Sequence, residues 1–328
     1  MTKATERRAL IVGVGGYLPE RIVTNHDLEK VMETSHEWIV ERTGIEKRHF
    51  VDDNQATSDL ATAAAERALA MAGMTGADID MIVVGTATPD EVFPSVATMV
   101  QARIGNTHGF AFDVAGACAG YVVALATANN FIRTGAVKTA LVIGAETISR
   151  LLDQNDRKTF VLFGDGAGAV VLKGVEPEDN PEDRGILDIR LYSDGRHHDI
   201  LHASGGPSST GTIGTIHMEG QEVFKHAVTK LGQAAQIILG DHQLTANDID
   251  WLIPHQANQR IIDAVAQRVN LPAEKVVSTV NQHANTSAAS IPLALSVAVA
   301  DGRVKQGDLI LHETIGGGLI WGSALVRF

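Results

Sequence analysis

The stretch Asp78-Ile79-Asp80-Met81-Ile82 returns in altered form 170 residues later as Asp248-Ile249-Asp250-Trp251-Leu252. Two more pairs of echoes follow in the same order, each 167 residues apart: Gly135-Ala136-Val137-Lys138 with Gly302-Arg303-Val304-Lys305, and Glu146-Thr147-Ile148 with Glu313-Thr314-Ile315. Each echo alone is a weak match, but ordered echoes at nearly one spacing indicate a duplicated unit. The sequence therefore predicts a pseudo-twofold pair of halves and not a solenoid.

Short apolar runs typical of strands alternate with amphipathic or Ala-rich segments typical of helices. The predicted strands span 9–12, 80–85, 111–114, 140–143, 251–253 and 309–312, and the predicted helices span 25–32, 35–43, 58–72, 94–104 and 118–134. This alternation predicts an α/β fold with helices covering the sheets. The acidic segment 176–185, which holds two prolines, is typical of a solvated surface loop. We expect it to divide the chain into an N-terminal half, 1–178, and a C-terminal half, 179–328.

The composition is that of a soluble globular protein, with 45% apolar and 20% charged residues. A net charge of −12 disfavours nucleic acid as a partner. No run of 18 apolar residues occurs, so we expect no membrane association, and the apolar run 9–12 is too short for a secretion signal. A single cysteine excludes an internal disulfide and fits a reducing cytosol, which predicts a cytoplasmic protein.

The one cysteine, Cys118, lies among small residues at the start of the predicted helix 118–134. A shift of 167 residues from Cys118 gives Asn285, so that each residue would open a small-residue helix in its own half. In a pseudo-twofold pair, two such helix N-termini can converge beside free backbone N–H groups. We therefore expect a nucleophile whose thiolate is favoured by the helix dipole and a neighbouring histidine. The alternative is a small buried core residue.

Two more features fit this chemistry. His255 follows the predicted strand 251–253, and α/β folds place ligands at strand ends. Gly316, Gly317 and Gly318 follow the strand 309–312 and would let backbone N–H groups approach a reacting oxygen. The sequence thus predicts a cysteine that attacks, with His255 and Asn285 holding the developing negative charge. The alternatives are a surface histidine, one of 13, and an ordinary glycine turn.

Two other glycine runs invite a different interpretation. Gly13-Val14-Gly15-Gly16 and Gly164-Asp165-Gly166-Ala167-Gly168 both lack the spacing of a dinucleotide-binding loop. We expect both to form tight turns at sheet edges rather than a nicotinamide site.

Several motifs lie along the chain in a specific order: Ala117-Cys118-Ala119-Gly120, Pro254-His255-Gln256-Ala257-Asn258, Asn285-Thr286-Ser287-Ala288-Ala289-Ser290, Gly316-Gly317-Gly318 and Trp321-Gly322-Ser323. With these motifs the chain closely resembles, over essentially its whole length, the 3-oxoacyl-[acyl-carrier-protein] synthase III family of condensing enzymes in the thiolase superfamily. The resemblance implies a thiolase-like fold with two duplicated halves in a five-layered α-β-α-β-α arrangement. It also implies a homodimer.

The activity implied by this resemblance is an acyltransferase reaction at the start of fatty-acid synthesis. An acyl-CoA primer would condense with malonyl-acyl carrier protein, with loss of CO2, to give 3-oxoacyl-acyl carrier protein and CoA. Cys118, His255 and Asn285 match the catalytic set, and Cys118 would carry the acyl group as a thioester. The backbone N–H groups of Cys118 and Gly317 would form the oxyanion hole. No metal and no permanently bound cofactor are implied, and the sequence holds no metal-ligand cluster.

The resemblance also assigns binding residues. Those that match the CoA and phosphopantetheine channel are Thr34, Trp38, Arg42, Arg157, Asn258 and Arg260. Trp38 and Arg157 would sandwich the adenine, which suits an indole and a guanidinium. Phe93 matches the residue that closes the acyl pocket of the partner subunit. For docking of the acidic carrier protein we expect Lys225, Gln256, Arg260 and Arg268, although Lys225 and Arg268 are also explained as scattered surface charges.

This chain departs from the family pattern in two places. Ala284 stands before Asn285 where the family usually has Gly, and His36 stands where an acidic residue is common. The nearest alternative function is a related condensing enzyme or acyltransferase of a secondary-metabolite pathway. A degradative thiolase would need a second cysteine, an oxidoreductase would need a cofactor fingerprint, and a non-catalytic acyl-binding or thiol-sensing protein would not need the Cys/His/Asn set.

Overall fold

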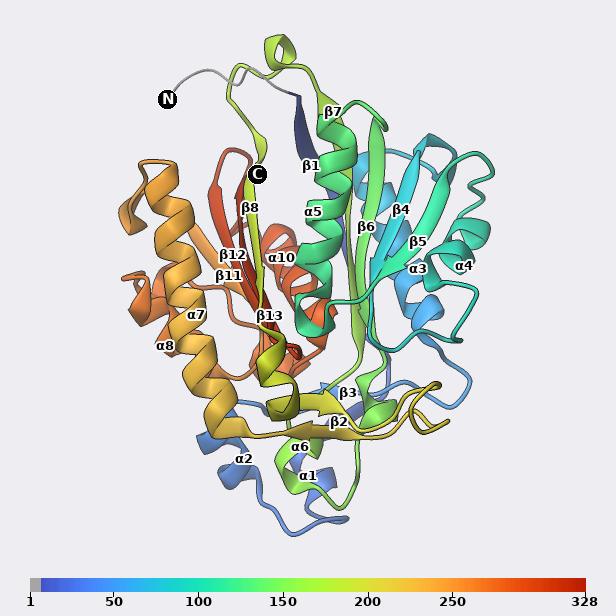
Figure 1. Ribbon diagram of the computed structural model, residues 1–328, viewed down its shortest axis with the longest axis vertical. Helices are drawn as coiled ribbons and strands as arrows, with labels where there is room; N and C mark the ends of the chain where they lie inside the picture. The colour runs from blue at the N-terminus through green and yellow to red at the C-terminus, as the bar shows by residue number, and fades with distance from the viewer. Residues whose placement is uncertain (1–6) are drawn as a thin grey trace.

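Two β-sheets form the framework of the computed structural model, which describes residues 7–328 (Figure 1). The first sheet has the strand order β1 (Arg8–Tyr17), β7 (Gly166–Val175), β6 (Thr139–Glu146), β4 (Met81–Gly85) and β5 (Phe110–Val114). The second has the order β11 (Trp251–Pro254), β12 (Leu309–Gly316), β13 (Ile320–Arg327) and β8 (Gly185–Ser193). In each sheet the parallel pairs, β4 with β5 and β6, and β11 with β12, are continued by antiparallel strands.

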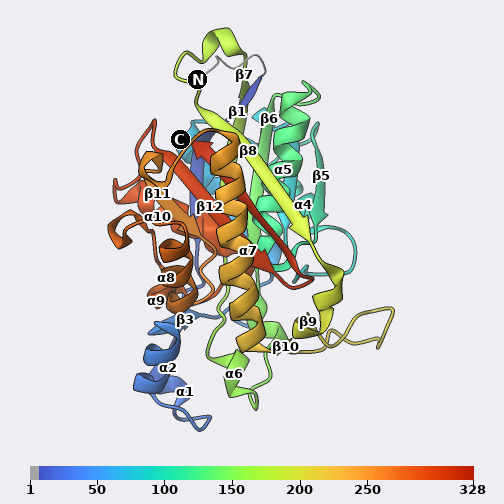
Figure 2. The ribbon, with the colours of Figure 1, turned by 60° about the vertical axis from the view of Figure 1, so that its left-hand side comes forward.

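Helices cover both faces of both sheets (Figure 1, Figure 2). α3 (Thr57–Ala72) and α4 (Val96–Arg103) pack on the outer face of the first sheet, and α5 (Gly120–Arg133) and α10 (Ser290–Ala300) lie between the sheets. α7 (Gly220–Asp241) covers the outer face of the second sheet, with α8 (Gln259–Arg268) beside it. The predicted α/β fold with five layers is therefore confirmed.

Each contact between layers has its own buried apolar cluster. The central cluster joins both sheets through α5 and α10 and includes Leu125 and Leu295. A second cluster lies under α3, where Ala68 is fully buried, and a third lies under α7 and α8, around Leu231 and Val265. Because sheets cover both sides of α10, most of its residues are apolar and buried, as expected for a helix without a solvent face.

The smaller elements gather at one end of the layers, at the lower end in Figure 1. They include the hairpin of β2 (Ile22–Thr24) and β3 (Lys47–His49) and the helices α1 (Asn25–Leu28), α2 (His36–Thr43), α6 (Arg157–Phe160) and α9 (Val280–His283). The hairpin of β9 (Leu201–Ala203) and β10 (Ile216–Met218) lies at the same end in Figure 2. Within residues 7–328, no helix is long and apolar enough to cross a membrane.

The duplication is visible in matching local structures 170 residues apart. Thr75 with Asp78 and Thr245 with Asp248 each form a capping box on a short 3-10 turn. Strand registers repeat the spacing, because Met81 pairs with Ala140 and Trp251 pairs with Ile310. The predicted boundary at residue 178 falls in the 3-10 turn Pro177–Asp179, between β7 and β8. The division into halves at that residue stays a prediction, and the first six residues of the N-terminal half lie outside the described range.

The predicted equivalence of Cys118 and Asn285 is wrong by three residues. The 3-10 turns Ala117–Ala119 and Ser287–Ala289 precede α5 and α10, and both begin with a positive φ, 43° at Ala117 and 50° at Ser287. The matching partner of Cys118 is therefore Ala288. The 167-residue spacing applies only to the C-terminal ends of the helices, because α5 has 14 residues and α10 has 11.

The predicted glycine turns are also wrong in part. Gly13–Gly16 continue strand β1, and Gly166 and Gly168 belong to β7, with Gly16 paired to Gly168. A Cβ on Gly13 would overlap the carbonyl oxygen of Ala68 in α3, so glycine here permits close helix–sheet packing and not a turn.

Candidate active site

Cys118 lies in the 3-10 turn Ala117–Ala119, directly before α5. Thr314 of β12 donates its hydroxyl to the Cys118 carbonyl oxygen at 3.0 Å. A Cβ on Gly316, the last residue of β12, would lie 2.7 Å from the Cys118 nitrogen, so only glycine lets this strand end come so close. The second half of the molecule therefore supports the turn that carries the cysteine.

One segment of the second half, Ser287 to Ser290, connects the three predicted catalytic side chains. Ser287 hydrogen-bonds the Cys118 thiol, and its backbone N–H donates to Oδ1 of Asn285 at 2.9 Å. Ser290 Oγ, at the start of α10, lies 2.6 Å from Nδ1 of His255. The structure thus brings Cys118, His255 and Asn285 to one turn, while their catalytic roles stay a prediction.

His255 lies just after β11, as expected, and is only 4% exposed. The backbone N–H of Gln256 donates to Ser290 Oγ at 3.3 Å, which leaves the Ser290 hydrogen free to be donated to Nδ1 of His255. This arrangement favours the tautomer with its hydrogen on Nε2. Burial lowers the pKa of His255 to about 4, so the ring is neutral at pH 7. A neutral Nε2–H is a hydrogen-bond donor suited to an oxygen that gains negative charge.

Asn285 is held by both of its neighbours in the fold. Its backbone N–H donates to Leu162 at 2.9 Å, and its carbonyl accepts from Gly164 at 3.0 Å. Because its side-chain oxygen already accepts from Ser287, the side-chain NH2 is the group left to donate. Ala284, just before it, has φ 58° and ψ −161°, a conformation that almost only glycine adopts without strain. The departure from the family's glycine therefore places strain next to Asn285.

The free thiol differs from the expectation. Burial and the negative charge of Glu146 raise the pKa of Cys118 to about 11, against a smaller opposing effect of the Ser287 hydrogen bond. The expected thiolate is therefore not the resting form at pH 7, and with His255 neutral no imidazolium is present to favour it. The cysteine must lose its proton during the reaction.

Gly317 follows β12 in the turn that leads to β13. Its neighbour Gly316 is the glycine in contact with the Cys118 nitrogen, whereas a Cβ on Gly317 would lie 2.7 Å from the Leu201 carbonyl oxygen of β9. The turn of β12 thus lies between the cysteine turn and the β9–β10 hairpin. The oxyanion hole of Cys118 and Gly317 stays a prediction.

Trp38 of α2 and Arg157 of α6 are brought together, but without a gap between them. The guanidinium carbon of Arg157 lies 4.6 Å from the Trp38 ring centroid, and that of Arg42 lies 5.0 Å from it. A purine between Trp38 and Arg157 would need about 7 Å, two van der Waals separations. Arg157 must therefore move before an adenine can enter, and this breaks its 2.7 Å hydrogen bond to the Glu33 carbonyl.

Two other predicted channel residues differ in their bonding. Thr34, just before α2, has a buried hydroxyl oxygen without a hydrogen-bond partner. Asn258 caps α8, since its side-chain oxygen accepts from the Ile261 N–H at 3.0 Å, and its NH2 group remains for other partners. The unpaired Thr34 oxygen is the kind of group that a polar ligand satisfies.

One predicted docking residue is corrected by the structure. Gln256 is 1% exposed and cannot reach a carrier protein. Its NH2 group donates to Pro254 at 2.7 Å and Val277 at 3.2 Å, and its oxygen accepts from the Thr279 N–H at 2.8 Å. Gln256 is a structural side chain that ties β11 to the segment before α9, because a buried amide must satisfy its hydrogen bonds.

The other docking residues are exposed on two adjacent helices, Lys225 on α7 and Arg260 and Arg268 on α8. The Arg260 guanidinium lies 5.9 Å from the Phe224 ring, and the stem of Arg268 packs on Gly232. The two helices therefore run in the same direction and present their basic residues along one ridge.

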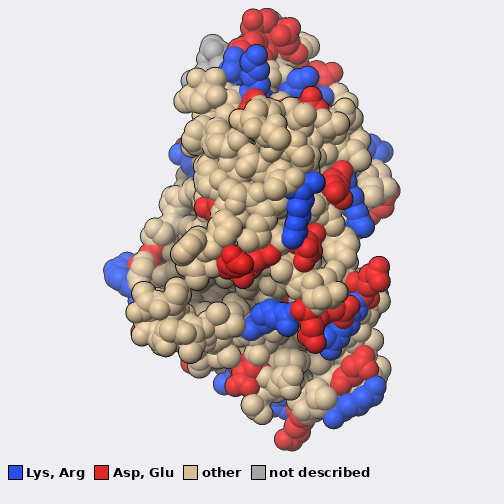
Figure 3. Space-filling model, turned by 90° about the vertical axis from the view of Figure 1, so that its right-hand side faces the viewer, with Lys and Arg blue, Asp and Glu red and all other residues tan. Residues whose placement is uncertain are grey.

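Phe93 lies in the loop between β4 and α4 and is 82% exposed. Its neighbour Val92 is 74% exposed, and Phe110 on the edge strand β5 is 43% exposed. Figure 3 looks at this side of the molecule and shows a wide area without charged side chains. The single chain thus leaves an apolar surface around β5 uncovered.

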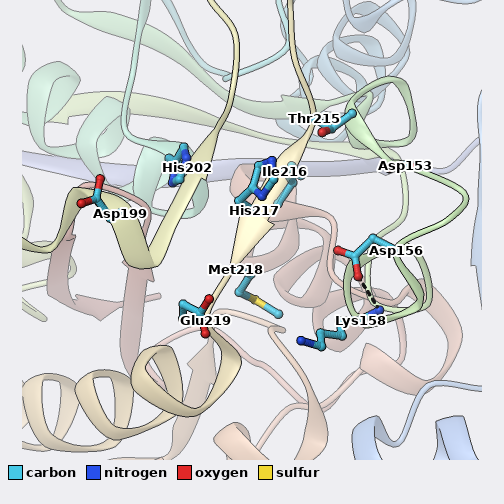
Figure 4. A pocket seen from close by; sticks show the side chains of 10 residues that line it. All are labelled: Asp153, Asp156, Lys158, Asp199, His202, Thr215, Ile216, His217, Met218 and Glu219. Carbon is cyan, nitrogen blue, oxygen red and sulfur yellow. Dashed lines mark hydrogen bonds between the residues drawn. The ribbon is translucent and has the colours of Figure 1, made fainter.

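A cavity of about 420 Å³ lies between the β9–β10 hairpin and the segment before α6 (Figure 4). Its polar lining includes Asp156, Lys158, His202 and His217. None of its lining residues belongs to the predicted catalytic set, and it lies beside Arg157 of the predicted CoA site.

Sequence reasoning missed the roles of Ser287, Ser290 and Glu146. The first two lie in the quoted motif after Asn285, but only their contacts show that they hold the thiol, the amide and the imidazole. Glu146 appeared only as part of a repeat echo, although it accepts a hydrogen bond from Ser287 at 3.0 Å.

Two regions of the chain match models of one protein family. Residues 112–195 match 3-Oxoacyl-[acyl-carrier-protein (ACP)] synthase III, and residues 239–328 match the C-terminal part of the same family. The beta-ketoacyl-[acyl-carrier-protein] synthase III of Paramagnetospirillum magneticum is 58% identical, over 98% of this chain and 99% of that protein. The enzyme of the same description from Allorhizobium ampelinum is 55% identical over 98% and 99%.

Solved structures agree with these matches. The 3-oxoacyl-[acyl-carrier-protein] synthase III of Aquifex aeolicus has a TM-score of 0.92 and 43% identity, with 98% of this chain and 100% of that chain covered. The priming beta-ketosynthase of the R1128 polyketide biosynthetic pathway has a TM-score of 0.91 and 33% identity, with 99% and 97% covered. From its sequence and its backbone, the chain belongs to the 3-oxoacyl-[acyl-carrier-protein] synthase III family.

Proposed function

We propose that this enzyme condenses an acyl-CoA primer with malonyl-acyl carrier protein and so initiates fatty-acid synthesis. The observation that carries the proposal is the segment Ser287 to Ser290, which contacts the Cys118 thiol, the Asn285 amide and the His255 ring. A nucleophile and two neutral hydrogen-bond donors held by one rigid segment are what a decarboxylative condensation needs.

In the first half-reaction, Cys118 Sγ attacks the acyl-CoA carbonyl. The backbone N–H groups of Cys118 and Gly317 hold the tetrahedral oxyanion, in the manner of an oxyanion hole. The bond from the carbonyl carbon to the CoA sulfur then breaks. The proton lost by the Cys118 thiol leaves with CoA, and the acyl group stays on Cys118 as a thioester.

In the second half-reaction, the carboxylate of malonyl-acyl carrier protein departs as CO2. Its electron pair forms an enolate, whose oxygen accepts from His255 Nε2–H and the Asn285 NH2 group. The enolate carbon attacks the acyl-Cys118 carbonyl, the bond to Sγ breaks, and the sulfur takes up a proton. Since both donors are neutral and buried, they stabilise the enolate more than the neutral thioester that precedes it.

For CoA, we propose that adenine enters between Trp38 and Arg157 after Arg157 turns away from the indole. The rest of the carrier arm runs past Thr34, Arg42, Asn258 and Arg260. The partnerless hydroxyl of Thr34 supports this path, because a ligand would satisfy it.

For the carrier protein, we propose docking on the ridge formed by Lys225, Arg260 and Arg268. A local basic ridge is needed because the whole chain has a net charge of −12 and repels an acidic partner elsewhere. Lys225 is already paired with Glu222 at 2.6 Å, so Arg260 and Arg268 carry most of this attraction.

We further propose a homodimer in which a second copy covers β5. An uncovered edge strand with exposed Val92, Phe93 and Phe110 beside it is a site that proteins usually protect. In such a dimer, Phe93 of each subunit would close the acyl pocket of the other. We expect the enzyme to act in the cytoplasm, without a permanently bound cofactor.

A related condensing enzyme of a secondary-metabolite pathway is the second candidate. The polyketide priming ketosynthase matches the backbone almost as well as the fatty-acid enzyme from Aquifex aeolicus, with TM-scores of 0.91 and 0.92. Sequence identity favours the fatty-acid role, at 58% against 33%.

The test is a panel of acyl-CoA esters from acetyl to decanoyl, incubated with the enzyme and followed by intact-protein mass spectrometry. We expect one acyl adduct on the wild-type chain and none on Cys118→Ala. An undiminished adduct on Cys118→Ala would reject the proposed nucleophile. Turnover of the best primers with malonyl-acyl carrier protein then distinguishes the two candidate pathways.

A further inference from the structure

The mechanism above leaves one question open, namely which group receives the proton of the Cys118 thiol. The thiol is protonated at rest because its pKa is about 11. The His255 Nδ1 is occupied by Ser290, and the proposed work of Nε2 is to donate and not to accept. The hydrogen bond that the thiol makes is to Ser287.

Ser287 leads from the thiol to a fully buried carboxyl group. Its hydroxyl donates to Oε1 of Glu146 at 3.0 Å, and Glu146, the last residue of β6, has no exposed surface. A hydroxyl has one hydrogen and two lone pairs, so a serine that donates to Glu146 accepts from the thiol. The resting arrangement is therefore a directed chain from S–H to O–H to carboxylate.

The surroundings of Glu146 stabilise its ionised form without a neighbouring cation among its hydrogen-bond partners. From the loop after β4, Thr88 Oγ1 donates at 2.6 Å, Thr86 Oγ1 at 3.3 Å and the Ala87 N–H at 3.1 Å. From the turn before α10, Ser287 donates its hydroxyl, and Ala288 adds a backbone hydrogen bond. The titratable group that faces it is the Cys118 thiol, from the turn before α5.

We propose that Glu146 accepts the proton of the Cys118 thiol through the Ser287 hydroxyl as the sulfur attacks the acyl thioester, an inference that rests on the proposed acyl transfer. The S–H bond breaks as the S–C bond forms, the thiol proton moves to Ser287 Oγ, and the Ser287 proton moves to Glu146 Oε1. When the CoA thiolate leaves, it takes up one proton and Glu146 returns to its ionised form. Ser287 touches the reacting sulfur, and Glu146 acts through it.

The ionisation of Glu146 suits this task. Burial raises its pKa to about 7, although four of its hydrogen bonds act in the opposite direction. A proton acceptor works best when its pKa lies near the pH at which it operates. Acylation should therefore increase with pH through about 7, as Glu146 becomes ionised, and level off above it.

The test measures the rate of acyl-adduct formation on Cys118 between pH 5.5 and 9, by rapid quench and mass spectrometry. Glu146→Gln keeps the size of the side chain but cannot accept the proton. We expect its rate at pH 8 to fall about 100-fold or more, the usual contribution of a positioned base. The rise near pH 7 should disappear, and the rate should instead increase steadily toward the ionisation of the thiol itself. Ser287→Ala should behave in the same way.

Thr88→Val is the matched variant, because it removes one hydrogen bond to the same carboxylate and leaves the path through Ser287 intact. That hydrogen bond lowers the pKa of Glu146, so its loss should move the midpoint of the rise to higher pH without removing it. This shift cannot come from a purely structural role.

The proposal is overturned if Glu146→Gln keeps the wild-type rate and profile, or if the midpoint of folded Thr88→Val does not move. If Glu146→Gln fails to fold, Thr88→Val still decides. Absence of a Cys118 adduct in the wild type would instead reject the proposed function and leave this outcome distinct.

Discussion

Removing the hydroxyl of Ser290 should separate the two half-reactions. Ser290 is 2% exposed and His255 is 4% exposed, and their hydrogen bond of 2.6 Å fixes both the orientation and the tautomer of the ring. In Ser290→Ala the buried Nδ1 loses its partner, which costs about 1–3 kcal/mol when no water replaces it. The ring is then free to carry its hydrogen on either nitrogen.

The expected loss falls on decarboxylation, because that step uses the Nε2–H donor. At 1.36 kcal/mol for each factor of ten, a loss of about 1–3 kcal/mol corresponds to a rate decrease of about 5- to 150-fold. Self-acylation of Cys118 should stay within about twofold of the wild type. The free energy of unfolding should fall by a similar 1–3 kcal/mol.

The assay is single-turnover release of labelled CO2 from malonyl-acyl carrier protein on pre-acylated enzyme, beside the rate of acylation. Ser296→Ala is the control, since Ser296 lies on the same helix and its hydroxyl bonds only the Leu293 carbonyl of that helix, at 2.8 Å. Unchanged CO2 release in folded Ser290→Ala would refute the role given to this hydrogen bond. An equal loss of acylation would show that Ser290 supports the whole site and not His255 alone.

Three more outcomes are expected. Trp38→Ala should weaken acyl-CoA binding by about 1–3 kcal/mol, the value of one stacked base, as measured by calorimetry; unchanged affinity would make Trp38 a packing residue. Gly316→Ala should abolish acylation because its Cβ would lie 2.7 Å from the Cys118 nitrogen, whereas Gly195→Ala has open space and should be neutral in the same assay. Burial lowers the pKa of His312 to about 4, so the unfolded state, with a histidine pKa near 6.5, binds the extra proton as pH falls between these values. Folded stability from this group is lost over that range at about 1.4 kcal/mol per pH unit, and His312→Leu should flatten urea-unfolding stability against pH by that amount; an unchanged slope would contradict it.

The layers of the fold could be predicted from local patterns. The repeated Asp-Ile-Asp motif marks a strand start in both halves, and in each half its second aspartate accepts from the first residue of a neighbouring strand: Asp80 from Thr139 and Asp250 from Leu309. These contacts depend on short-range geometry that the duplication preserves. The five-layered order came from the family resemblance and not from these patterns.

The register of the active-site turns could not be predicted because the duplicated helices differ in length. The last residues of α5 and α10 keep one spacing and their first residues another, so an echo at one end misplaces the other by three residues. Glycine-rich strands misled the analysis for a different reason. Glycine marks turns in most sequences, whereas Gly13 lies in a strand because α3 packs against it.

The supporting polar groups were hidden because their partners are remote in sequence. Ser287 and Glu146 are 141 residues apart, and no local pattern indicates that they meet. Gln256 was placed on the surface because polar side chains are usually exposed. Its three internal hydrogen bonds become visible only when β11 and the segment before α9 are in place.

The central claim is that one turn unites a thiol that carries the acyl group with an amide that serves the second substrate. Asn285→Ala, loaded with its acyl group and then mixed with malonyl-acyl carrier protein, tests this most directly by mass spectrometry over time. We expect the variant to acquire the acyl mass as the wild type does and to retain it, while the wild type loses it to product. Loss of the acyl mass from Asn285→Ala at the wild-type rate, with CO2 released, would contradict the account.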